Sequence, residues 1–181
     1  MAKTKIKFTY EDYKSLPESE TKRYELLEGE LVMVPSPTFE HQDILSNLLV
    51  ELWNFVEEHD LGVVVTAPLD VVLGEDVVQP DILYVSKRRA RIITHEEIRG
   101  APDLVVEILA PPTAQRDRTY KKRLYARHGV REYWLVDPDE KTIEVLSLGE
   151  RGFERVSLYH EDETLSSPLL PGLKIELKEI F

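Results

Sequence analysis

The stretch Asp103-Leu104-Val105-Val106-Glu107-Ile108-Leu109 is apolar on both faces of a strand except at Glu107. A strand of this kind is typical of the centre of a sheet that is covered on both sides. A second apolar stretch, Gln79-Pro80-Asp81-Ile82-Leu83-Tyr84-Val85, carries Asp81. Because an ionised carboxylate in a buried strand is costly unless a cation or several donors meet it, Asp81 and Glu107 suggest a shared ligand, and the simplest one is a metal ion.

Composition limits the kind of protein and the kind of metal. With 181 residues and 42% apolar content, the chain can bury a core, and its length predicts one domain over residues 1–181. It has no run of eighteen apolar residues and no apolar signal core at its amino terminus, so we expect a cytoplasmic protein without a membrane partner. It has no cysteine, so a metal must take oxygen or imidazole ligands, which favours Mg²⁺ or Mn²⁺.

Charge is unevenly distributed along the chain. The net charge of −11 repels nucleic acid on average. Two basic clusters interrupt the acidic background, and either could face a phosphate backbone or solvate a helix surface, the second being the commoner role. They comprise Lys87, Arg88, Arg89 and Arg91, and then Arg116, Arg118, Lys121, Lys122, Arg123, Arg127 and Arg131.

The sequence on either side of these strands predicts an α/β fold. Cap, turn and periodicity signals predict helices that begin at Thr9, at Thr38 and at Thr113 or Ala114, the last ending at Gly129. Strands are predicted over residues 23–34 as a hairpin turning at Glu28-Gly29, and over 63–66, 69–73, 77–85, 103–109, 132–136, 141–146, 153–158 and 173–177, with a polar connector over 86–102. This order indicates a central sheet flanked by helices, with additional antiparallel strands at both ends.

The helix after residue 113 can bring a cation to the two acids. Asp117, Lys121 and Tyr125 stand at steps of four and share one face. If the strands of Asp81 and Glu107 are neighbours in register, both carboxylates converge, and the helix packs back across the sheet toward them. Two acids, a divalent metal and a lysine form a site suited to hydrolysis of a phosphoryl group.

Several stretches together resemble the Uma2 family, restriction-endonuclease-like proteins of the PD-(D/E)XK superfamily. They are Arg23-Tyr24-Glu25-Leu26-Leu27-Glu28-Gly29-Glu30, Val78-Gln79-Pro80-Asp81, Ala101 to Leu109, and Tyr125 through Tyr133-Trp134-Leu135-Val136-Asp137-Pro138. The resemblance implies a restriction-endonuclease-like mixed sheet, with Asp81 and Glu107 as the two acids. The superfamily lysine position, two residues after the second acid, is Leu109 here. The family's helix pattern falls on Asp117, Lys121 and Tyr125, so we assign the lysine role to Lys121, with Lys122 as the fallback.

Each of these residues also has a structural interpretation. Asp81 could cap a turn after Pro80, and Glu107 could be paired with a helix cation, as buried acids usually are. Lys121 alone would more often be a solvated lysine. His41 occupies a family-like position and could support the site, and Glu28 is a weaker candidate that could equally be a hairpin acid.

The resulting hypothesis is a magnesium-dependent endonuclease that hydrolyses phosphodiester bonds of DNA. Asp81, Glu107 and the backbone carbonyl of Ile108 would hold Mg²⁺ or Mn²⁺, and Lys121 would position the attacking water. The alternative is a nuclease-fold module that binds nucleic acid or a protein partner without cutting. A homodimer would allow cleavage of both strands, although no stretch of the sequence identifies an interface.

Overall fold

A computed structural model describes residues 6–17 and 22–181. The helices are α1 (Tyr10–Lys14), α2 (Phe39–Glu58), α3 (Ala114–Arg116) and α4 (Lys122–His128), with a π-helical turn at Asp117–Lys121 and 3₁₀ turns at Lys87–Ile92 and Leu177–Glu179. The strands are β1 (Arg23–Leu27), β2 (Glu30–Val34), β3 (Gly62–Thr66), β4 (Val71–Leu73), β5 (Asp76–Val78), β6 (Ile82–Ser86), β7 (Ile98–Arg99), β8 (Leu104–Ile108), β9 (Glu132–Asp137), β10 (Thr142–Gly149), β11 (Gly152–His160), β12 (Thr164–Leu165) and β13 (Ile175–Glu176).

The central sheet is mixed, as the sequence predicted. Its six strands lie in the order β11-β10-β9-β8-β6-β3. Strand β8 is parallel to β9 and antiparallel to β6, while the other neighbours in this sheet are antiparallel. All five residues of β8 are buried, which agrees with a strand covered on both faces.

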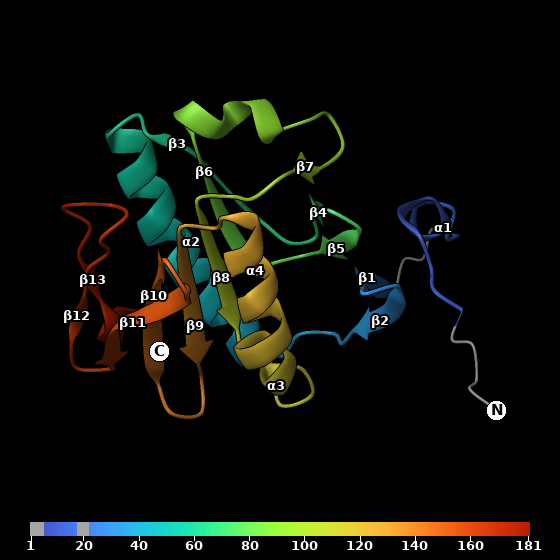
Figure 1. Ribbon diagram of the computed structural model, residues 1–181. Helices are drawn as coiled ribbons and strands as arrows, with labels where there is room; N and C mark the ends of the chain where they lie inside the picture. Colours follow the sequence, from blue (N-terminus) through green and yellow to red (C-terminus); the bar gives the residue numbers. More distant parts are fainter. Residues whose placement is uncertain (1–5, 18–21) are drawn as a thin grey trace.

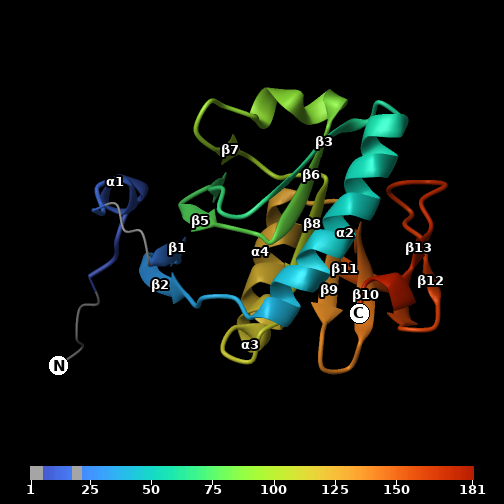
Figure 2. The same cartoon turned by 180° about the vertical axis from the view of Figure 1, so that it is seen from behind.

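Helices cover the two faces of this sheet. Helix α2 lies behind the sheet in Figure 1 and in front of it in Figure 2, and α4 lies on the opposite side. The inward residues of α2, at the helical spacing, pack into one core cluster with the sheet and the C-terminal segment: Ile44, Leu48, Leu52 and Val56. Leu124 and Tyr125 of α4 belong to the second core cluster, on the other face.

A second sheet lies beside α4 on that other face (Figure 1). Its order is β2-β1-β5-β4-β7. The single strand predicted over residues 77–85 is therefore wrong, since its two ends belong to different sheets, as β5 and β6. Pro80 has no N–H to give to a ladder, and the N–H of Gln79 donates to the Glu25 side chain (2.9 Å) instead of to a strand. The segment Gln79-Pro80-Asp81 thus connects the two sheets.

Other differences from the predicted elements are small. The polar connector over 86–102 contains the 3₁₀ turn Lys87–Ile92 and the short strand β7, which lies parallel to β4. Strand β11 is longer than predicted, and β13 is shorter. No helix within residues 6–17 and 22–181 is both long and apolar enough to span a lipid bilayer.

Candidate active site at the junction of the two sheets

Asp81 lies directly before strand β6, next to the strand β8 that carries Glu107. In the antiparallel pair of β6 and β8, Ile82 is opposite Val106 and Leu83 is opposite Val105. Asp81 immediately precedes β6, so continuing this register by one position places it opposite Glu107. The Asp81 carboxylate oxygen Oδ2 accepts a hydrogen bond from the N–H of Ile108 (2.7 Å), which fixes Asp81 at the end of β8.

Lys121 and Tyr125 both contact Glu107. The Lys121 ammonium lies 3.0 Å from Oε1 of Glu107, and the Tyr125 hydroxyl donates to the same oxygen at 2.7 Å. Asp117, at i−4 on the same helical segment, lies 3.5 Å from the ammonium. The face predicted to carry Asp117, Lys121 and Tyr125 therefore exists. Lys122 lies instead along a separate surface hollow with Arg123.

Glu25 joins this cluster although it is not among the site residues predicted from the sequence. Its Oε1 lies 2.9 Å from the Lys121 ammonium and accepts from the N–H of Gln79. The signal that reveals Asp81 and Glu107 was present here as well, because Glu25 interrupts the apolar run of strand β1. Lys121 therefore joins acids from both sheets and from its own helix.

The buried cluster contains more negative than positive charge. Glu25, Glu107, Asp117 and Lys121 are each at most 5% exposed, and Asp81 lies beside them. Burial, reinforced by the neighbouring carboxylates, raises the pKa of Glu107 well above its usual range and also raises the pKa of Asp117. Burial acts to lower the pKa of Lys121, but the surrounding acids outweigh it and raise that pKa well above its ordinary value, so Lys121 is an ammonium.

His41 closes the other side of the pair. Its Nε2 lies 3.4 Å from Oδ2 of Asp81, and its ring also faces the backbone carbonyl of Ile108. Burial acts to lower the pKa of His41, whereas the hydrogen bond and negative charge of Asp81 raise it, and the net shift is upward. The Asp81 carboxylate and the Ile108 carbonyl therefore both face the same side chain, the imidazole of His41.

These groups line a cavity of about 370 Å³. Its walls include two proline-containing loops, one between β2 and α2 and one between β8 and α3. The side-chain oxygen Gln79 Oε1 is buried here without a hydrogen-bond partner among the residues that the structure describes, and Asp117 Oδ1 has no hydrogen bond there either, although the Lys121 ammonium lies 3.5 Å from it. Unpartnered buried acceptors are uncommon and indicate a site that receives a donor or a cation.

The donor set fits a hard divalent cation. No three side chains of His, Asp or Glu within the described ranges converge as a ready-made chelate. Magnesium, however, needs only one or two carboxylates and fills its other positions with water and substrate oxygens. A dication at Asp81 and Glu107 would also offset the neighbouring negative charges, which add to burial in raising the pKa of Glu107.

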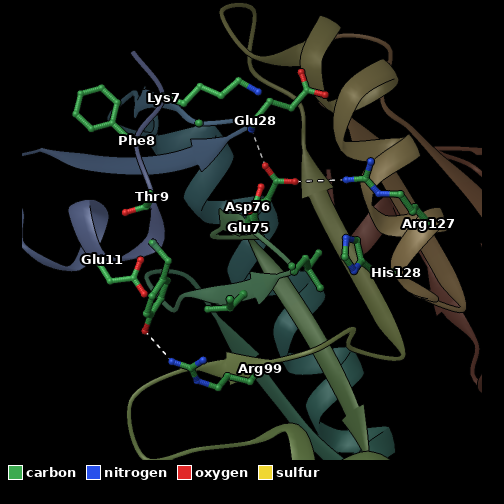
Figure 3. A pocket seen from close by; sticks show the side chains of 15 residues that line it. Lys7, Phe8, Thr9, Glu11, Glu28, Glu75, Asp76, Arg99, Arg127 and His128 are labelled. Atoms are coloured by element: carbon green, nitrogen blue, oxygen red, sulfur yellow. Dashed lines mark hydrogen bonds and ion pairs between the residues drawn. The ribbon is translucent and has the colours of Figure 1, made fainter. Parts of the chain in front are cut away.

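Glu28 is not brought to this site. It lines a separate cavity of about 940 Å³, enclosed by the segment Lys7–Glu11, the turns at Gly29 and Gly74, and the end of α4 (Figure 3). The buried acid of that cavity, Asp76, already accepts from the N–H of Glu28 and from the Tyr120 hydroxyl. The carboxylate of Asp76 is therefore satisfied within the protein.

Comparisons with known proteins agree with this architecture. The Uma2 family, described as "Putative restriction endonuclease", matches residues 10–178. A solved structure, described as a "putative nuclease belonging to DUF820" from Anabaena variabilis ATCC 29413, is 26% identical, with a TM-score of 0.80 over 96% of this chain and 97% of that one. No curated protein matches the chain. The fold is thus that of a nuclease, and the chain belongs to the Uma2 family of restriction-endonuclease-like proteins.

Proposed function

We propose that this protein is a magnesium-dependent endonuclease that hydrolyses phosphodiester bonds of DNA at the cavity formed by Asp81, Glu107 and Lys121. The observation that carries the proposal is that Asp81, which immediately precedes β6, and Glu107 of the neighbouring strand β8 line one cavity with a buried ammonium, which contacts Glu107. The family description and the description of the structural neighbour support nuclease chemistry.

Three oxygen donors would hold the magnesium ion. They are the carboxylates of Asp81 and Glu107 and the backbone carbonyl of Ile108. On Glu107, Lys121 and Tyr125 both engage Oε1, so Oε2 is the oxygen available to a cation. When bound, the ion would supply Lewis-acid chemistry toward a phosphoryl oxygen.

Lys121 would act as an electrostatic and orienting group. Its raised pKa keeps it protonated, so it can donate hydrogen bonds but cannot remove a proton from water. Glu25 and Glu107 fix this ammonium, so it would be held in advance for the negative charge that develops on the phosphoryl group. In the reaction, the water oxygen bonds to phosphorus and the water releases a proton to solvent, the phosphorus–oxygen bond to the leaving strand breaks, and the leaving oxygen takes a proton from solvent.

A plasmid-nicking assay with Mg²⁺ or Mn²⁺ tests the proposal. We expect wild-type protein to convert supercoiled DNA to the nicked form, and Asp81→Asn and Glu107→Gln to abolish this activity. Glu140→Gln, which changes an exposed acid, should retain it. Unchanged nicking by Asp81→Asn and Glu107→Gln would overturn the assignment of these acids.

A second candidate function is favoured by the same ion pairs. Lys121 is enclosed by Glu25, Glu107 and Asp117, so the acids are partly neutralised within the fold. A binding module that does not cut would need no metal. Calorimetry separates the two, because such a module should show no uptake of Mg²⁺ at Asp81 and Glu107.

A further inference from the structure

We infer that Arg23 and Arg116 form a phosphate-binding pair at this cavity, which holds a substrate strand through phosphates other than the one that is hydrolysed. This inference rests on the proposed function and names two residues that position its substrate. Arg23 is the first residue of β1, and Arg116 lies in α3 immediately before Asp117. Both line the cavity that contains Asp81 and Glu107.

The two arginines differ from the others in being partly buried and unpaired. Across residues 6–17 and 22–181, neither guanidinium has a carboxylate at ion-pair distance or a hydrogen-bond partner. The remaining arginines without an anionic partner are exposed, and they are Arg88, Arg91, Arg123 and Arg151. Partial burial of an unpaired guanidinium costs desolvation, which an arriving anion would offset.

The basic clusters of the sequence are mostly used for structure. Arg118 pairs with Asp137 and with Glu144, and Arg89 and Arg131 share Asp103. In the other large cavity, Arg127 pairs with Asp76, as the dashed line in Figure 3 shows. Arg116 is therefore the member of its cluster that lies at the candidate site without a partner.

The position of the pair selects a polyanion as its ligand. The cavity also contains Glu25, Glu107 and Asp117, yet neither arginine lies within ion-pair distance of any of these acids. Arg23 shares a strand face with Glu25, two residues away. A guanidinium beside an acidic centre, unpaired with it, can bind a phosphate in a bidentate manner. A strand with successive phosphates can meet both arginines while one of its phosphates lies at the acids.

Binding can be measured apart from cleavage. Fluorescence anisotropy with a labelled DNA oligonucleotide, single-stranded or duplex, in EDTA reports affinity and its dependence on salt. We expect Arg23→Gln and Arg116→Gln each to weaken binding about tenfold. Each should also reduce the slope of log K against log salt by about 0.7 on a single strand, or about 0.9 on duplex. Arg123→Gln, on the outer side of α4, is the matched control and should change neither quantity.

Further variants separate this inference from the proposed function. Arg23→Lys and Arg116→Lys should keep the salt slope and lose part of the affinity, because lysine retains the charge without the bidentate geometry. If both glutamine variants bind with the wild-type affinity and slope, the pair is overturned, even where nicking still depends on Asp81. If binding depends on the pair and wild-type protein does not nick DNA with Mg²⁺, the pair stands and the proposed endonuclease activity fails. Absence of any wild-type binding overturns the pair alone, because the nicking assay with Mg²⁺ decides the endonuclease activity separately.

Discussion

Replacing Lys121 by methionine tests whether the buried ammonium stabilises the acidic cluster. The substitution keeps an unbranched side chain but leaves Glu25, Glu107 and Asp117, which lie 2.9, 3.0 and 3.5 Å from the ammonium, without a counter-cation. Removing one partner of a buried ion pair typically costs about 3–5 kcal/mol. For a domain of this size, that lowers the melting temperature by roughly 6–20 °C.

The assay is thermal and urea denaturation of Lys121→Met at several pH values in a chelator. Because the pKa of Glu107 is raised in the folded state, the folded protein binds more protons than the unfolded chain between the ordinary and the raised pKa. Stability therefore falls as pH rises through this window, and acidification should reduce the deficit of the variant. Lys122→Met, the adjacent lysine on a different face, should change stability by less than about 0.5 kcal/mol. A Lys121→Met protein as stable as wild type at neutral pH would refute the reasoning.

Three further predictions concern the acids. Glu107→Gln, in a chelator at neutral pH, should melt at a higher temperature than wild type because a buried repulsive charge is removed. The difference in melting temperature should close on acidification. A lower melting temperature of the variant would instead mark Glu107 as a purely structural acid. Calorimetric titration with Mg²⁺ should detect binding that Asp81→Asn abolishes and Glu140→Gln preserves, and wild-type protein without binding heat would support the non-cutting module. Ser167→Ala removes one of the hydrogen-bond donors that satisfy the buried carboxylate of Glu132. Urea denaturation should therefore show that the free energy of unfolding falls by about 1–3 kcal/mol. An unchanged denaturation midpoint would contradict this account.

The sequence predicts the part of the fold that depends on local pattern. The apolar stretch of β8 and the helical period of α2 are both found where their patterns place them. The break at Pro80 was not predicted, because the apolar run through residues 77–85 continues on both sides of it. Its cause is partly local, since Pro80 has no N–H for a ladder, and partly tertiary, since the N–H of Gln79 donates to Glu25, far away in the sequence.

The candidate site was predictable where acids interrupt apolar strands and less so elsewhere. The spacing of Asp117, Lys121 and Tyr125 predicted one shared helix face. In the structure Lys121 and Tyr125 contact Glu107, and Asp117 pairs with Lys121. Glu25 carried the same local signal, but its role depends on the second sheet, whose strand order no short motif encodes. Glu28 directly follows the apolar end of β1. The chain turns at Glu28, so this residue lines a different cavity.

The triple contact of Lys121 has a consequence for protein synthesis. Glu25 comes from β1, near the beginning of the chain, whereas Lys121 follows β8 and reaches the acid of that strand as well. Contacts between such distant positions form late in folding, because a long loop must close before they contribute. A nascent chain emerging from the ribosome therefore lacks the complete cluster until Lys121 has emerged and both sheets have docked.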